Sequence, residues 1–140
     1  MVTIEPPQLL SRLRASRAED VLGDLFDPQC PTRLVLDRIG DKWTVLVVLL
    51  LSDGPMRFSE LRTHLGSVAP KVLTQTLRRI ERDGLVTREI FAEVPPRVEY
   101  TLTELGRSLT APIAVIGDWA ETHLGEITAA QQAYDATLEA

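Results

Sequence analysis

The stretch from residue 67 to residue 84, SVAPKVLTQTLRRIERDG, has the pattern of a helix with one apolar face and one polar, basic face. At about 100° per residue, its apolar side chains fall on one side of a helix and its basic and amide side chains on the other. Pro70 suits the first helical turn, and Gly84 suits the left-handed position just past the end. The pattern therefore predicts a helix with one buried face and one face suited to anions. The apolar side consists of Leu73, Leu77 and Ile80.

The polar side of this helix combines cations with neutral hydrogen-bonding groups. Arg and Lys neutralise phosphates or bind guanine in a fork, and Gln pairs with adenine through two hydrogen bonds. This mixture is typical of a helix that enters the major groove of DNA. The alternative is the solvated side of an ordinary amphipathic helix. The candidate DNA-binding residues on this segment are Lys71, Thr74, Gln75, Arg78, Arg79 and Arg82.

Composition sets the outer bounds on fold and function. With 140 residues, of which 44% are hydrophobic, the chain is long enough for one globular domain with a real core. It contains no apolar run of the roughly 20 residues that a membrane span needs and no N-terminal signal pattern, so we expect a cytoplasmic protein. It also shows no Ser/His/Asp grouping, metal-ligand cluster or phosphate-binding glycine loop. We therefore expect no enzyme, no catalytic residues, no metal and no cofactor.

The acidic net charge of −5 is unevenly distributed. Residues 57–107 contain nine Lys or Arg and seven Asp or Glu, a net charge of +2, whereas the remainder contains six against thirteen, a net charge of −7. The acidic groups therefore lie mainly outside the candidate DNA-binding region. This distribution permits local binding to phosphates.

Residues 1–29 have roughly helical apolar spacing and predict an amphipathic arm. The arm either packs on its own subunit or contributes to a dimer interface. Cys30 then precedes a predicted helix that starts at Pro31 and runs to about Ile39. The positive end of a helix dipole favours the thiolate, so Cys30 is a candidate sensor of oxidants or electrophiles. A small buried side chain is the alternative, since free Cys is among the most buried residue types.

Two further helices are predicted before the amphipathic stretch. Asp41 caps the apolar run KWTVLVVLLLSDG, which we interpret as a central core helix, apolar on all sides, and not as a buried strand. Residues 55–58 are short and extended, and Ser59 is expected to cap a two-turn helix that ends at Gly66. Two helices joined by a tight turn, the second with a basic face, predict a helix-turn-helix.

After Gly84 the apolar period changes to two, which predicts two strands over residues 85–91 and 97–102. The connecting loop contains Pro95 and Pro96, and Arg97 stands at its exit. A hairpin in this place predicts a winged helix-turn-helix whose tip reaches an adjacent groove or phosphate. The alternative for Arg97 is a cross-strand pair with Glu93 or Glu99.

The last segment begins with Thr103 as a predicted helix cap, and Pro112 is expected to kink or restart the helix. The stretch from Glu126 to the end either extends the helix or frays. An apolar stripe follows the completed DNA-binding module and has little left to cover within its own subunit, so we assign it to a dimer interface. The stripe and its neighbours are Leu109, Ile113, Ile116, Trp119, Ala120 and Leu124.

The motifs CPTRLVLDRIGDKW, RFSELR, APKVLTQTLRRIERDGLV and EVPPRVEYTLTELG occur in this order over about residues 30–123. Together they resemble the HxlR-type winged-helix transcriptional regulators, a group similar to the MarR regulators. The resemblance implies a homodimer that binds double-stranded DNA and responds to an oxidant or small-molecule effector, with Cys30 at the position of the sensor in some members. Many relatives have Ser where this chain has Ala69, and the lost cap is worth about 1 kcal/mol. The residues that the resemblance places at the DNA are Arg57, Ser59, Ala69, Pro70 to Arg79, Pro95, Pro96 and Arg97.

The predicted fold is mainly α with a small β-hairpin, in the α+β class. The predicted parts are an N-terminal helical arm (1–29), a winged helix-turn-helix domain (30–107) and a C-terminal dimerisation helix with its tail (108–140). The predicted function is sequence-specific transcriptional regulation by a homodimer on a pseudo-palindromic operator, with Cys30 as the point of redox response. The alternative is a winged-helix module that binds protein without reading DNA sequence.

Overall fold

The computed structural model describes residues 31–139, with side chains from Arg33 onward. The chain divides into two compact units, Met1–Gly40 and Asp41–Ala140. The first unit contains helix α2 (Pro31–Gly40), which confirms the helix predicted after Cys30. Cys30 itself and the predicted arm over residues 1–29 lie outside the described residues.

The second unit starts with helix α3 (Lys42–Leu51). Asp41 caps it as predicted, because its carboxylate accepts a hydrogen bond from the Trp43 backbone N–H at 3.0 Å. The apolar run is therefore a helix, and its buried side packs against α5 in the centre of the core. The expectation that it is buried on all sides is wrong, since Leu46 and Leu49 are each more than a third exposed.

Helices α4 (Phe58–Leu65) and α5 (Pro70–Arg82) form the predicted helix-turn-helix. Gly66 ends α4 at a φ of 68°, a left-handed value that glycine adopts without steric cost. The predicted cap of α4 is wrong. Helix α4 begins one residue before Ser59, and Arg57 is the N-cap residue, with its backbone N–H donating to the Glu60 carboxylate at 3.3 Å.

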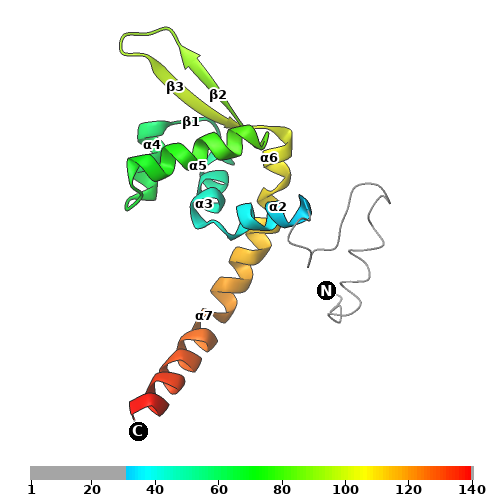
Figure 1. Ribbon diagram of the computed structural model, residues 1–140, viewed down its shortest axis with the longest axis vertical. Helices are drawn as coiled ribbons and strands as arrows, with labels where there is room; N and C mark the ends of the chain where they lie inside the picture. Colours follow the sequence, from blue (N-terminus) through cyan, green and yellow to red (C-terminus); the bar gives the residue numbers. More distant parts are fainter. Residues whose placement is uncertain (1–30, 140) are drawn as a thin grey trace, which may run out of the picture. The chain divides into compact units, whose positions relative to one another are not determined.

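The sheet contains one strand more than the predicted hairpin. Strands β2 (Val86–Phe91) and β3 (Arg97–Leu102) form the wing, and β1 (Met56–Arg57) adds to the other edge of β3 in the antiparallel order β1-β3-β2 (Figure 1). Residues 55–58 were predicted to be extended, but the sequence did not indicate which strand so short a segment would pair with. The pairing of Met56 and Arg57 with β3 joins the wing to the start of α4.

The closing helical segment is split into α6 (Glu104–Ser108) and α7 (Thr110–Glu139). Thr103 caps α6 as predicted, accepting from the Gly106 N–H at 3.0 Å. The chain restarts at Thr110, which places Pro112 in the first turn of α7, where its missing N–H costs nothing. The tail continues the helix to Glu139, so the first of the two expectations for it is confirmed.

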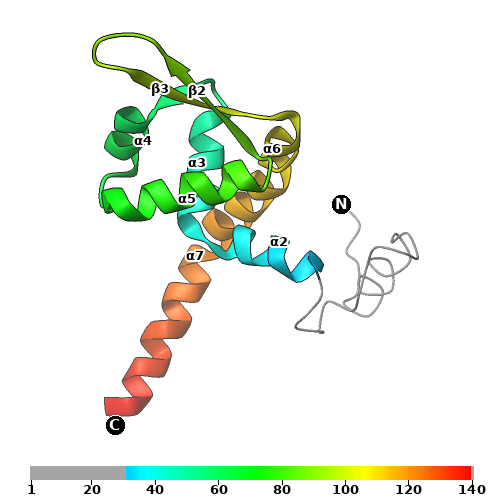
Figure 2. The ribbon, with the colours of Figure 1, turned by 45° about the horizontal axis from the view of Figure 1, so that its top comes forward.

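The core of the second unit lies between α3, α5 and the sheet (Figure 2). Gly106 fits tightly against it, because a Cβ there would lie 2.1 Å from the Leu85 backbone oxygen. None of the described helices is both long and apolar enough to cross a membrane. The fully buried side chains of the core are Val47, Val48, Leu51, Leu61, Leu73, Leu77, Ile80 and Val86.

Candidate nucleic-acid interface

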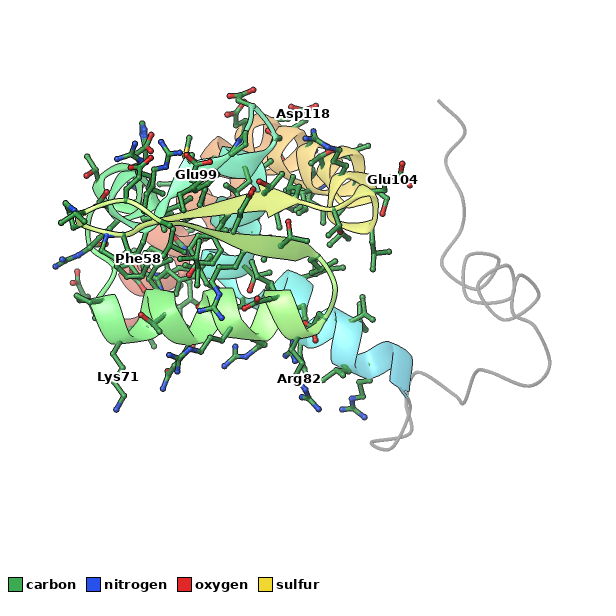
Figure 3. All side chains as sticks on the ribbon, turned by 90° about the horizontal axis from the view of Figure 1, so that it is seen from above. Phe58, Lys71, Arg82, Glu99, Glu104 and Asp118 are labelled. Carbon is green, nitrogen blue, oxygen red and sulfur yellow. The ribbon has the colours of Figure 1, made fainter. Side chains whose placement is uncertain are left out.

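The outward face of α5 is open and basic. Lys71 and Arg82 project from the same outer side of the helix, away from the sheet (Figure 3). Gln75 and Arg78 lie between them and are exposed as well. The opposite side of α5 is held by Leu73, Leu77 and Ile80, all of them fully buried. This division confirms the predicted two-faced helix.

Thr74 lies at the edge of this face and is only partly exposed. Its hydroxyl donates to the Pro70 carbonyl oxygen at 2.9 Å, one turn earlier on the same helix. A hydroxyl that donates to a carbonyl oxygen of its own helix cannot donate a hydrogen bond to DNA at the same time. Thr74 was predicted only as a neutral hydrogen-bonding residue, and in this arrangement it can offer DNA a methyl group and an acceptor lone pair.

Arg79 has a partner within the protein. Its guanidinium lies 3.5 Å from the carboxylate of Asp41, the residue that caps α3. The Arg79 side chain is nearly half exposed, so water screens this pair and it contributes at most about 1 kcal/mol. The same carboxylate offsets part of the charge that Arg79 would present to a phosphate.

The start of α5 lacks a side-chain cap. Ala69 is the N-cap residue, with an extended backbone and no side-chain hydrogen bond, and Pro70 follows at the first helical position. The first-turn N–H groups thus have no acceptor from the cap residue. Such groups favour an anion, because they carry the positive end of the helix dipole.

Arg97 forms ion pairs and a cation–ring contact within the wing. Its guanidinium lies 3.3 Å from the Glu93 carboxylate, 3.5 Å from the Glu99 carboxylate and 4.1 Å from the centre of the Phe91 ring. Its side chain is 25% exposed. The cross-strand alternative is therefore the arrangement observed, and the prediction of an open Arg-bearing tip is wrong. The exposed tip is apolar and contains Val94, Pro95 and Pro96.

The structure brings the predicted backbone-contact residues and the wing together. An open groove of about 410 Å³ runs between the start of α4 and the wing loop. Arg57 and Ser59 line one side of it, and residues 93–98 line the other. Two parts of the candidate set that are 36 or more residues apart in sequence thus share one surface.

The candidate dimer residues separate into two groups. Ile113 is 5% exposed and belongs to the core, and Leu109 is partly buried against that core. Their assignment to a surface stripe is wrong, because the first turns of α7 pack on α3 and α6. Ile116, Trp119 and Leu124 are each more than half exposed.

The exposed stripe on α7 is longer than the sequence analysis proposed. At about 100° per residue, three further exposed apolar side chains fall on the same side of the helix as Ile116 and Leu124. Their spacing of three to four residues was readable from the sequence. Polar Gln131 interrupts the series and weakens this pattern in the sequence. The additional residues are Ile127, Tyr134 and Leu138.

The described residues contain no group of three or more His, Cys, Asp and Glu side chains placed to hold a metal ion. One titratable group in this part of the chain is clearly perturbed. Burial raises the pKa of Tyr100, against the opposing charge of Arg88 and with a smaller contribution from Glu81. Tyr100 lies on β3, opposite Arg88 of the wing, and supports the sheet rather than the outward face of α5.

Comparisons with known proteins agree with this arrangement. The model of the HxlR-like helix-turn-helix family matches residues 38–128. The HTH-type transcriptional regulator YtfH of Escherichia coli strain K12 is 43% identical over 107 residues, covering 76% of this chain and 85% of its own. The solved structure of the transcriptional regulator YtfH from Salmonella typhimurium superposes with a TM-score of 0.73 at 42% identity, over 79% of this chain and 98% of its own. The redox regulator HypR in its reduced form gives a TM-score of 0.66 at 38% identity, over 71% of this chain and 98% of its own.

Proposed function

This chain belongs to the HxlR-like helix-turn-helix family of transcriptional regulators, and on that premise we propose that it acts as a homodimer on a pseudo-palindromic DNA operator. Family membership also bears out the expectation that it is not an enzyme. A regulator of this kind works in the cytoplasm, together with the DNA that it controls.

The observation that carries the proposal is the outward face of α5. Lys71, Gln75, Arg78 and Arg82 are all exposed there, on the second helix of a helix-turn-helix. In such units the second helix enters the major groove, and its side chains contact base edges. Gln75 and Arg78 lie near the middle of the face and are assigned to bases, whereas Lys71 and Arg82 are assigned to phosphates.

The homodimer is supported by the exposed stripe on α7, which runs from Ile116 to Leu138. A helix of 30 residues is about 45 Å long, and most of α7 extends away from the sheet and α5 (Figure 1). An apolar stripe that the other described residues leave exposed on a long helix is typical of a protein–protein interface. Paired α7 helices would present two α5 helices to major grooves about 34 to 36 Å apart.

The test compares target and scrambled duplexes for variants on α5. Gln75→Ala and Arg78→Ala should each reduce discrimination between the two duplexes by about 1 to 3 kcal/mol, since a paired base contact is worth that much. Arg107→Ala is the matched control, because Arg107 is an exposed cation on α6 and not on α5. Equal losses on both duplexes would demote Gln75 and Arg78 to phosphate contacts. A wild-type protein that binds neither duplex would favour the protein-binding alternative.

We also propose that Cys30 senses oxidants or electrophiles. Support comes from its place directly before Pro31, the first residue of α2, and from the similarity to HypR, which is named a redox regulator. Cys30 is the single cysteine of the chain, so its oxidised form would pair with a second chain or a small thiol. Cys30→Ser should keep DNA binding and abolish the response of that binding to diamide or a quinone. An unchanged response in the variant would remove Cys30 as the sensor.

A further inference from the structure

Val72 is a partly exposed apolar side chain at the border between the outward and the buried faces of α5. It is 37% exposed, whereas the other Val, Leu and Ile side chains of α5 are fully buried. At about 100° per residue it lies about 20° around the helix from Arg79 and about 60° from Gln75. Val72 was absent from the candidate set because apolar residues of a helix were assigned to its core.

Neither the core nor the helix explains a valine at this position. A side chain this exposed recovers only part of the free energy of full burial. Valine is also a weaker helix former than alanine, lysine or glutamine, since its branched Cβ loses rotamer freedom in a helix. The position is the third residue of α5, in the first turn, where a polar or acidic residue would favour the helix more.

The position does suit a base contact. The N-terminal residues of the second helix in a helix-turn-helix contact base edges. Side chains three residues apart on a helix have Cβ atoms about 5 to 6 Å apart, and stacked base pairs are about 3.4 Å apart. Val72 and Gln75 therefore reach the same base pair or adjacent ones.

The major groove offers one apolar group to such a side chain, the 5-methyl group of thymine. We propose that Val72 packs its two methyl groups against a thymine methyl, at or beside the A·T pair whose adenine is bound by Gln75. This contact would read thymine directly and would add sequence information that the cations of α5 do not supply. The inference rests on the proposed function, since it requires that α5 lies in the major groove.

A protein-docking role for Val72 fits its surroundings less well. Its neighbours on the outward face are Lys71, Gln75 and Arg79, so the apolar surface there is not continuous along α5. Apolar docking sites are contiguous patches, whereas a single apolar side chain among cations and an amide matches one methyl group among phosphates and base edges.

The experiment removes the thymine methyl group from the DNA and, separately, the two methyl groups of Val72 from the protein. Each thymine of the operator duplex is replaced in turn by deoxyuridine, which lacks only the 5-methyl group, and affinity is measured for wild type, Val72→Ala and Val72→Ile. At one position in each half-site, deoxyuridine should weaken the wild type about fourfold, the equivalent of about 0.8 kcal/mol. Val72→Ala should bind the thymine duplex about as weakly as the wild type binds a duplex with deoxyuridine at that position in both half-sites, and it should lose the penalty at that position. Val72→Ile should retain it.

Two results would overturn the inference. One is a wild-type protein that prefers its operator over scrambled DNA but shows no penalty at any deoxyuridine position. The other is a penalty that stays the same in Val72→Ala, because the methyl group would then be read by another residue. A wild-type protein with no preference between operator and scrambled DNA would overturn the proposed function together with this inference. Val115→Ala is the control, since Val115 is an exposed valine on α7, and its deoxyuridine profile should match the wild type.

Discussion

Asp41 caps helix α3 and pairs with Arg79 of α5, and its removal has two separable effects. One carboxylate oxygen accepts from the Trp43 N–H at 3.0 Å, and the other accepts from the Thr44 hydroxyl at 3.3 Å. The second oxygen also faces Arg79 at 3.5 Å. The variant Asp41→Ala therefore removes a helix cap, an acceptor for a buried hydroxyl and a counter-charge at the DNA face.

The stability cost follows from these contacts. Loss of an N-cap costs about 1 kcal/mol. Thr44 is 2% exposed, and a buried hydroxyl without its acceptor costs about 1 kcal/mol more. The exposed pair with Arg79 contributes at most about 1 kcal/mol and, after screening, less than the other two contacts. We expect Asp41→Ala to lower the free energy of unfolding by about 2 kcal/mol.

The matched control is Asp41→Asn, which keeps a capping oxygen and removes the charge. Asn caps helices about as well as Asp, so this variant should lose less than about 1 kcal/mol. Both variants should bind DNA more tightly, with a salt dependence that is steeper by up to about 1.8 in log–log slope, because one Arg79 in each subunit of the dimer becomes available to a phosphate and each contact contributes about 0.9. Urea unfolding followed by circular dichroism, at one fixed protein concentration, measures the first effect. Anisotropy titrations at several salt concentrations measure the second.

Equal losses of stability in the two variants would show that the charge of Asp41, and not its cap, stabilises the fold. An unchanged salt dependence in both would show that Arg79 does not reach a phosphate. Either result would refute the corresponding half of this reasoning.

Three further predictions concern the core, the sheet and the dimer. Gly106→Ala should lower the free energy of unfolding by about 3 kcal/mol, since its Cβ would overlap a backbone carbonyl. Gly125→Ala is the control, since nothing lies within 4 Å of its Cβ, and in urea unfolding it should cost nothing or stabilise α7. Because the pKa of Tyr100 is raised in the folded state, its neutral form stabilises the fold; this stability is present below pH about 10 and is lost as the pH rises through the raised value. In Tyr100→Phe, the free energy of unfolding measured against pH should not show this alkaline decrease. Ile116→Asp should shift the protein toward monomer in sedimentation equilibrium, whereas Val115→Asp, on another side of α7, should not; equal shifts would contradict the assigned stripe.

Helices α3, α5 and α6 were predictable because their own residues mark their ends. Asp41 and Thr103 are caps with side-chain acceptors, and Pro70 with Gly84 brackets α5. The two-faced pattern of α5 alone established which of its sides would be buried. Local chemistry of this kind acts within one turn of a helix, so it can be read from the sequence.

The errors arise where distant segments meet. Strand β1 has two residues and exists only because β3 lies beside it. Ile113 follows the same helical spacing as Ile116, and only the packing of the first turns of α7 separates the buried residue from the exposed one. Arg97 had two possible roles in the sequence, and the positions of Glu93, Glu99 and Phe91 around it determined which arrangement formed.

The exposed cations of the candidate site were identifiable from the sequence, whereas the exposure of Val72 and the internal hydrogen bond of Thr74 were not. Charged residues on a polar face are easy to identify, whereas an exposed Val72 resembles a core residue until its angle around the helix is measured. The hydroxyl of Thr74, predicted as a neutral hydrogen-bonding group, already donates to its own helix. Both cases depend on the position of a side chain on the helix surface, which residue type alone does not give.

The most direct test of the central claim is fluorescence anisotropy of the reduced protein on duplexes tiled across the DNA upstream of its own gene, at two salt concentrations. The account predicts tight binding to one inverted repeat, a marked loss of affinity at the higher salt concentration, and little binding to a scrambled duplex of the same composition. Binding of equal strength to every duplex, or no binding at either salt concentration, would contradict it.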